Sequence, residues 1–129
     1  MKPSHNLNLI CLNKILKYIN VIEEIYDFHN IKSVSDLQSN FMCQLAVTQA
    51  ITNIFELQKK MQAEILSKTP LFSKLFPTMS AARNIASHDY ESVDFEIIYR
   101  VTKQLTDKLM IQELEMLKND IKRSQTGNT

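Results

Sequence analysis

Glycine is nearly missing from this sequence: among 129 residues the single glycine is Gly127, close to the C-terminal end. Tight β-hairpin turns and phosphate-binding loops both depend on glycine, because it adopts backbone angles that other residues avoid. Proline is also scarce, with Pro3, Pro70 and Pro77. These shortages argue against hairpins and against a glycine-rich nucleotide site. They favour helices joined by short polar turns.

Long apolar runs are missing as well. No stretch reaches the length of a membrane span, and no basic segment followed by an apolar leader opens the chain. We therefore expect a cytoplasmic protein with no membrane partner. The two cysteines, Cys11 and Cys43, lie inside apolar helical patterns without partners at metal-binding spacing. They are predicted to be buried free thiols.

Charge of one sign is not in excess: 15 Lys and Arg residues face 14 Asp and Glu residues, for a net charge of +1. The chain as a whole therefore supplies no field for nucleic acid, and an RNA site must be a local patch. With 44% hydrophobic and 22% charged residues, the composition is that of a globular protein. We expect one domain over residues 1–122 and a flexible polar tail over residues 123–129.

Apolar residues recur at steps of three and four in the first half of the chain, which is the period of an α-helix. One segment runs from about residue 7 to 28. A second runs from about residue 37 to 67, and Ser33-x-x-Asp36 before it resembles a capping box. A break near Ser39-Asn40 would divide this second segment, and the sequence leaves that question open.

The second half of the chain continues the helical pattern. Pro70 is expected to end the second helix, with residues 71–76 as an apolar connector. Pro77 suits the first turn of a helix over about residues 78–87. A last long helix follows, with Ser92 and Asp94 both plausible as its N-cap. Its apolar stripe slips near residues 110–112. The sum is an all-α fold, an antiparallel bundle of four to five helices.

One stretch gathers side chains suited to chemistry, the eight residues Arg83 to Tyr90. The sequence contains no HExxH motif, no Cys/His pairing and no Walker loop, so we expect neither a metal nor a cofactor. Histidine transfers protons near neutral pH, and arginine binds phosphate and stabilises charge on its oxygens. Together His88 and Arg83 suit a metal-free transesterification of RNA, in which His88 removes the 2′-hydroxyl proton.

Two points of geometry bear on this pair. Five residues of helix turn about 500°, so Arg83 and His88 lie about 140° apart and share a pocket only if the helix ends or bends before His88. The polar run that follows predicts such an end. RNA cleavage also needs an acid besides the base, and a two-fold dimer would supply a second histidine. The alternative is that both residues only cap or ion-pair a helix end.

The pattern Arg83-Asn84-x-x-x-His88-x-Tyr90 resembles the signature of HEPN domains, and specifically the Arg-x-x-x-x-His-x-Tyr motif of the HepT-like toxins. The similarity covers roughly residues 9–117. The chain also departs from the family pattern. Tyr99 stands where a tryptophan is common, Phe76 stands near another customary tryptophan, and Phe55 precedes Glu56 where the family often has Gly-Glu.

The resemblance implies a HEPN-type homodimer that acts as a metal-independent endoribonuclease toxin, with its cleft at the dimer interface. It assigns Arg83 and His88 to catalysis and Asn84 to their support. It also implies an antitoxin partner of the minimal nucleotidyltransferase type, which silences the toxin by transferring AMP to Tyr90. Asp89, inside the motif, either orients His88 or repels the RNA backbone.

The sequence is compatible with three hypotheses. The first is the toxin ribonuclease, which requires Arg83 and His88 to be accessible in a basic interface cleft. The second is a non-catalytic helical partner subunit that binds a minimal nucleotidyltransferase. The third is a plain structural bundle, in which His88 is buried and satisfied internally.

Overall fold

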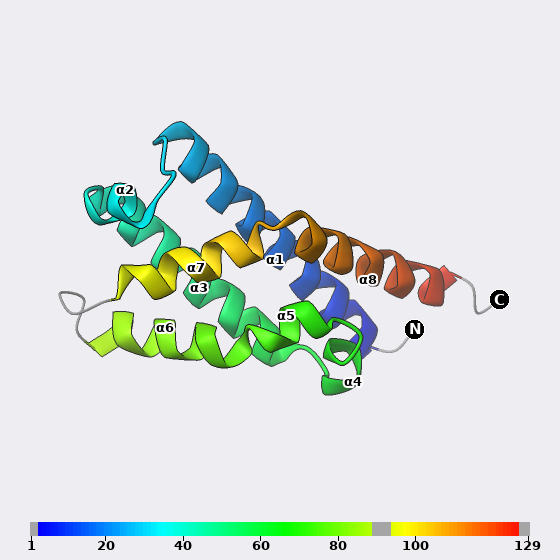
Figure 1. The fold of residues 1–129 in the computed structure, drawn as a ribbon. Coiled ribbons are helices and arrows are strands. Elements are labelled where there is room, and N and C mark those ends of the chain that lie inside the picture. The colour runs from blue at the N-terminus through cyan, green and yellow to red at the C-terminus, as the bar shows by residue number, and fades with distance from the viewer. Residues whose placement is uncertain (1–2, 89–93, 127–129) are drawn as a thin grey trace.

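The computed structural model describes the backbone of residues 3–88 and 94–126 and the side chains of residues 7–82 and 94–125. Over these residues the chain forms helices and no strand (Figure 1). The helices are α1 (Pro3–Phe28), α2 (Val34–Gln38), α3 (Phe41–Lys60), α4 (Ala63–Leu66), α5 (Pro70–Lys74), α6 (Phe76–His88), α7 (Phe95–Leu105) and α8 (Lys108–Thr126). The predicted all-α fold is confirmed, while several boundaries differ from those expected.

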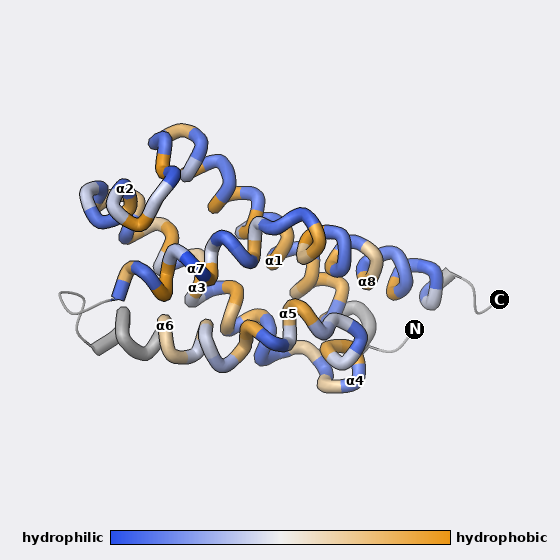
Figure 2. Tube along the Cα trace, viewed as in Figure 1, coloured by the Kyte–Doolittle hydropathy of each residue, from blue (hydrophilic) through white to orange (hydrophobic). Residues whose placement is uncertain are grey.

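Helix α3 lies at the centre of the bundle, where it contacts α1, α2, α6 and α7, and α8 packs against α1 and α5 (Figure 1). Apolar and polar residues are interspersed along the described parts of the longer helices (Figure 2). At helical spacing this pattern gives a helix one apolar side suited to burial. The fully buried side chains include Leu12, Ile15, Ile19, Ile22, Ile51, Ile54, Met79, Ile98, Leu105 and Leu114. Burial of each such side chain stabilises the fold by roughly 1.5–3 kcal/mol relative to exposure.

Asparagine replaces glycine where the backbone needs a left-handed residue. Helix α1 ends in a turn at Asn30, whose φ is 56°. The Asn30 N–H donates to the Asp27 carbonyl (3.3 Å), and the Ile31 N–H donates to the Tyr26 carbonyl (2.9 Å). This pair of bonds is a Schellman motif, which satisfies the last carbonyls of the helix. Asparagine tolerates the left-handed region better than other non-glycine residues.

Two side-chain caps separate α2 from α3 and settle the question left open at Ser39-Asn40. Ser33 Oγ accepts the Asp36 N–H (3.2 Å) at the start of α2, as the capping pattern predicts. The Asp36 carboxylate accepts the N–H of Lys32 (2.8 Å). Asn40 Oδ1 accepts the Cys43 N–H (3.0 Å) and begins α3. The segment is therefore a short helix followed by a long one.

The expectation of one helix reaching about residue 67 is wrong, because α3 ends at Lys60 and α4 is separate. The buried Asn8 side chain of α1 explains the break. Its Oδ1 accepts the backbone N–H of Gln62 (3.2 Å), and its Nδ2 donates to Gln62 Oε1 (3.3 Å). These contacts from a distant helix hold the non-helical backbone at Gln62, in a place without proline or glycine.

Pro70 begins a helix, so the predicted apolar connector is also wrong. It occupies the first turn of α5, where its missing N–H has no intrahelical role. The Glu113 carboxylate of α8 accepts the N–H groups of Leu71 and Phe72, each at 3.0 Å. A carboxylate at this position satisfies two of the unpaired donors at a helix start. Helix α5 is therefore capped from 41 and 42 residues away in the chain.

The last long helix is divided into α7 and α8 at Thr106 and Asp107. Asp107 Oδ1 accepts the N–H of Leu109 (2.9 Å), as a capping aspartate does, and so starts α8. The slip of the apolar stripe three residues further on marked this change of direction. Helix α8 then extends through the first part of the predicted tail to Thr126.

Cys11 and Cys43 are buried free thiols, as predicted. Burial raises the pKa of both thiols, which keeps them protonated and unreactive. Among the helices described, none is long and apolar enough to cross a membrane.

Candidate active site

Helix α6 carries the candidate site, and its first half is anchored in the core. Phe76 stacks on Phe55 of α3, with ring centroids 4.8 Å apart. Pro77 lies in the first turn, as predicted. Met79 and Ala82 are buried one turn apart and mark the side of α6 that faces the bundle. Because this half is held by packing, the backbone of the second half is positioned as a continuation of the same helix.

Three of the predicted site residues, Arg83, Asn84 and His88, lie on the last two turns of α6. Asp89 and Tyr90 lie outside the residues that the structure describes, as do the side chains of the first three. The expectation that the helix ends or bends before His88 is wrong, since α6 includes His88. Arg83 and His88 are therefore about 140° apart around one continuous helix. A single chain does not bring these two backbone positions to the same side.

The positions where the chain departs from the family pattern are filled by aromatic pairs. Tyr99 of α7 stacks on Tyr26 of α1, with ring centroids 5.8 Å apart. Phe55 stands where the resemblance gives glycine as frequent in the family, and its ring stacks on that of Phe76. The Phe55 ring thus packs against Phe76, which stands near a position where tryptophan is common in the family. Aromatic pairs of this kind stabilise a core beyond the area that they bury.

The end of the bundle that holds the end of α6 also exposes apolar residues. Helices α3 and α6 pack together and run in opposite directions, so the first turn of α3 and the last turn of α6 lie toward the same end (Figure 1). In that turn of α3, Phe41, Met42 and Leu45 are exposed, with Met42 at 73%. We call these three residues the α3 patch. Large apolar side chains gathered on a surface mark contact sites more often than isolated ones do.

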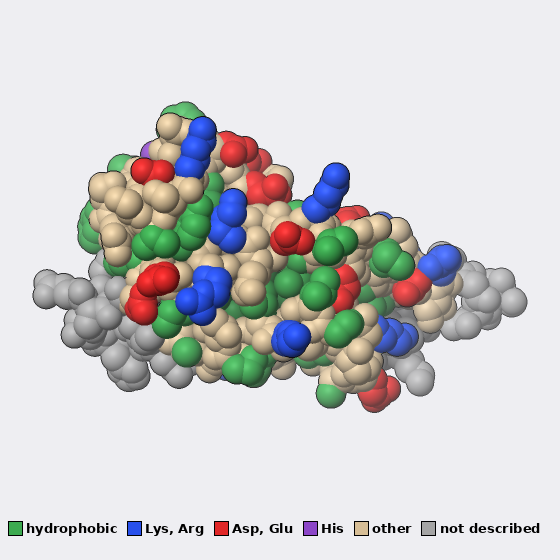
Figure 3. All heavy atoms as spheres, viewed as in Figure 1, with side chains coloured by type: hydrophobic (Ala, Val, Ile, Leu, Met, Phe, Trp, Pro, Cys, Tyr) green, Lys and Arg blue, Asp and Glu red, His purple; other side chains and the backbone are tan. Residues whose placement is uncertain are grey.

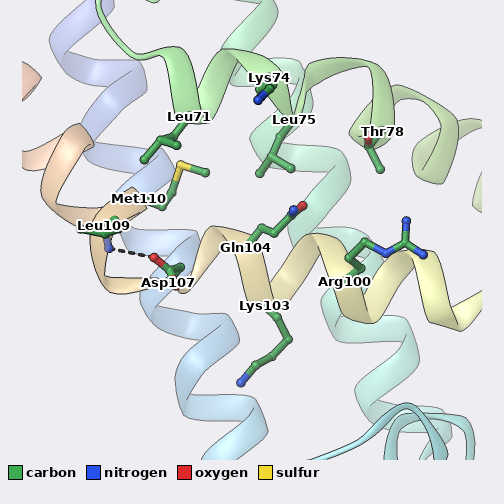
Figure 4. Close-up of a pocket in the computed structure, with 10 residues that line it drawn as sticks. All are labelled: Leu71, Lys74, Leu75, Thr78, Arg100, Lys103, Gln104, Asp107, Leu109 and Met110. Atoms are coloured by element: carbon green, nitrogen blue, oxygen red, sulfur yellow. Dashed lines mark hydrogen bonds between the residues drawn. The ribbon is translucent and has the colours of Figure 1, made fainter.

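A second surface feature is a groove of about 690 Å³ between α5 and the α7–α8 junction (Figure 4). Leu71 and Leu75 line one wall, and Arg100 and Gln104 line the other. Sequence reasoning missed this groove because its residues come from separate helices. The available signal was the spacing of Arg100, Gln104 and Asp107, at steps of four and three, which places polar groups along α7 and at its junction with α8.

No group of three histidine, cysteine or carboxylate side chains is placed to hold a metal ion within the part of the chain that the structure describes. The family model described as Ribonuclease HepT-like matches residues 15–116, which is most of the chain. The chain belongs to the HepT-like ribonuclease family. The resemblance drawn from the motif of α6 is thus confirmed at the level of the family. No curated protein and no solved structure matches this HepT-like chain.

The family match extends over most of the helical bundle. The matched residues include the helices from α2 to α7, the second half of α1 and the first half of α8, so the family domain includes part of every helix described. A HepT-like ribonuclease family implies RNA as the substrate class. Arg83, Asn84 and His88 lie within the match, on the last two turns of α6, whose first turns are anchored in the core.

Proposed function

We propose that this chain is a metal-independent endoribonuclease toxin in which Arg83 and His88 cleave RNA. The observation that carries the proposal is the motif Arg83-Asn84-x-x-x-His88-x-Tyr90 at the end of α6, inside a chain of the HepT-like family. His88 removes the proton of a ribose 2′-hydroxyl, and the oxygen attacks the adjacent phosphorus. The 5′-oxygen leaves with a proton. The products are a 2′,3′-cyclic phosphate and a 5′-hydroxyl.

The reaction needs charge stabilisation and a proton donor in addition to the base. Arg83 supplies the first, because its guanidinium binds the phosphate oxygens as negative charge grows on them. Asn84 supports the site by orienting its neighbours or the RNA. Asp89 either orients His88 or repels the phosphate. The proton donor for the leaving oxygen is His88 of a second copy of the chain.

The helix geometry favours a site shared between two copies. Arg83 and His88 diverge by about 140° on one helix, so residues from two α6 helices combine more readily in one cleft than residues from one. Position 88 also lies nine residues, or about 180° around the helix, from the buried Met79. The α3 patch lies toward the same end and suits a two-fold contact. We propose a homodimer that buries this patch.

An antitoxin of the minimal nucleotidyltransferase type would control this toxin through Tyr90. The phenol oxygen of Tyr90 attacks the α-phosphorus of ATP, AMP becomes attached to the tyrosine, and pyrophosphate leaves. The modified side chain then carries negative charge and bulk two residues from His88, where the RNA phosphate has to bind. Modification of Tyr90 therefore opposes substrate binding by charge repulsion and by obstruction.

Cleavage of RNA in excess EDTA tests the proposal. The chain is produced without an antitoxin, and wild type is compared with His88→Ala and Arg83→Ala. His29→Ala is the matched control, since this histidine lies at the end of α1. Wild type and the control should release cyclic-phosphate ends, while the two site variants should lose at least about a hundredfold in rate. Equal cleavage by His88→Ala would refute the assignment, and no cleavage by any form would favour a non-catalytic partner subunit.

A second experiment tests the dimer separately. Met42→Asp places a charge in the α3 patch. Ile10→Asp is the matched control, because Ile10 is an exposed apolar residue near the start of α1, outside the patch. Sedimentation should show that Met42→Asp is monomeric and that the control remains dimeric. RNA cleavage should be lost with the dimer. A monomeric variant that retains full activity would contradict the shared site while leaving the ribonuclease assignment intact.

A further inference from the structure

The groove beside α5 continues along α8 and has an exposed apolar floor. A second hollow of about 290 Å³ adjoins it, and Leu71 and Leu109 line both. Leu71, Leu109 and Met116 are exposed to 44%, 64% and 61%. Leu109 and Met116 are seven residues apart on α8, so they lie on the same side of the helix about 10 Å apart. We call the two hollows together the α5–α8 groove.

Cations border this floor, and the nearby carboxylates are hydrogen-bonded or ion-paired to other groups. Lys74 and Arg100 line the first hollow and Lys68 lines the second, and none of the three forms an ion pair with a described residue. The carboxylates beside them have other partners. Glu113 caps α5, Asp107 caps α8, and Asp120 pairs with Arg123. Three cations, Lys74, Arg100 and Lys103, and one carboxylate, Asp107, line the first hollow, so the excess of positive charge lies there.

The side-chain directions support a surface that is open to a partner. Figure 4 shows Leu71 and Met110 facing each other across the groove, with Gln104 reaching toward Leu75. Arg100 lies at the end of the groove near Thr78. Figure 3 shows apolar side chains on this face, with separate Lys and Arg side chains (blue) and Asp and Glu side chains (red) between and around them. An apolar strip bordered by cations matches a partner with an apolar strip bordered by carboxylates.

We propose that the α5–α8 groove binds an acidic amphipathic helix of a partner protein. Apolar residues of such a helix at positions i, i+3, i+4 and i+7 match the spacing of the groove floor, as in other helix-in-groove complexes. Glutamates or aspartates on its flanks pair with Lys74, Arg100 and Lys68. RNA fits less well, because no aromatic side chain lines either hollow to stack on a base.

This proposal is independent of the proposed ribonuclease activity. The groove reaches α6 at Thr78, which lies ten residues and about 15 Å before His88 along the helix. A helix bound in the groove therefore contacts the start of α6 and leaves its last turn uncovered. Capping of α5 by Glu113 keeps the Leu71 wall in place, so the groove exists before a partner binds.

Selection from a displayed peptide library tests the proposal with the full chain. The library holds helical peptides with leucines at i, i+3, i+4 and i+7, and with flanking positions randomised among Glu, Lys, Gln and Ala. Peptides selected on wild type should carry Glu on their flanks, and their affinity should fall as salt increases. Recovery of lysine-rich peptides, or of no binding peptide, would overturn the proposal.

Variants locate the binding surface of the selected peptide. Leu109→Glu should weaken binding by at least about tenfold, and Lys74→Glu with Arg100→Glu should weaken it by a similar factor. A peptide with its glutamates changed to lysines should regain affinity for the double variant. Ile10→Glu is the matched control and should bind as wild type does, and circular dichroism should show that every variant is folded.

Two further outcomes would overturn the inference. One is a selected peptide whose affinity is unchanged by Leu109→Glu, because its binding site would then lie elsewhere. The other is a single-stranded RNA that displaces the peptide and itself loses affinity for the Lys74→Glu, Arg100→Glu variant. That result would identify the groove as a nucleic-acid surface. RNA cleavage by wild type would be unaffected by either outcome, so failure here is distinguishable from failure of the proposed ribonuclease activity.

Discussion

Replacement of Tyr26 by phenylalanine should destabilise the protein near neutral pH and stabilise it in strong alkali. The Tyr26 hydroxyl lies 2.6 Å from Thr102 Oγ1, and both residues are buried. Thr102 uses its own proton on the Tyr99 carbonyl (2.8 Å), so Tyr26 donates to Thr102. The change to phenylalanine removes this one bond and keeps the ring that packs on Tyr99.

The expected loss at pH 7 is that of one buried hydrogen bond. Thr102 keeps its own donor bond, so the free energy of unfolding should fall by about 1 kcal/mol. For 129 residues this corresponds to a drop in Tm of about 4 °C. Tyr18→Phe is the matched control, because Tyr18 is half-buried and makes no hydrogen bond within the described residues. It should change stability by less than about 0.5 kcal/mol.

The alkaline behaviour follows from the pKa of Tyr26. Burial raises this pKa from 10.0 to about 12. The stability that comes from the protonated folded form is present below pH 10 and is lost as pH rises from 10 to 12. The total loss is roughly 2–3 kcal/mol for wild type, and the phenylalanine variant has no such loss. The two stabilities should therefore cross near pH 11.

Urea denaturation of both proteins at pH 7, 9, 10, 11 and 12 measures this crossing. Cys11 and Cys43 also have raised pKa values, but they are present in both proteins and cancel in the difference. Comparison of the ultraviolet titrations of the two folded proteins should show that the tyrosine missing from the Tyr26→Phe variant ionises at a higher pH than in the unfolded chain. A stability difference that stays constant from pH 7 to pH 12 would refute the reasoning.

Two other changes test the turns on which the fold depends. Glu113→Ala removes both acceptors at the start of α5 and should cost about 1–2 kcal/mol, with faster hydrogen exchange at Leu71 and Phe72. Glu113→Gln keeps one acceptor and should cost about half as much; unchanged exchange in both variants would contradict the capping role. Asn30→Ala forces alanine into the left-handed region and should cost about 1 kcal/mol in urea denaturation. Asn30→Gly should be as stable as wild type or more so, and equal loss in both variants would show that the asparagine side chain, rather than its backbone, stabilises the turn.

Local features of the sequence were sufficient for the helices and for several of their ends. The apolar period marked α1, α3 and α7, and the capping residues Ser33 and Asp94 marked two of the starts. The proposed catalytic residues, Arg83 and His88, were visible for the same reason, because both lie within one stretch of eight consecutive residues. A motif that is contiguous in the chain can be read without knowledge of the fold.

Contacts between distant residues decided the features that sequence reasoning missed. The break after Lys60 depends on Asn8, which lies 54 residues before Gln62. The helix that begins at Pro70 depends on Glu113. Nothing in the sequence distinguishes Asn8 or Glu113 from the other polar residues. Weak helix propensities are overridden in such places by hydrogen bonds from packed neighbours.

By itself the sequence determined an all-α bundle of the HepT-like family, buried thiols, and a compact polar motif at one helix end. Only the tertiary structure decided that α6 continues through His88, where α3 and the last helix break, and that cations of three segments border one apolar groove. The physical reason is the range of the interactions involved. Helical periodicity and capping act over a few residues, whereas a groove, a long-range cap and a shared surface exist only when separate helices pack together.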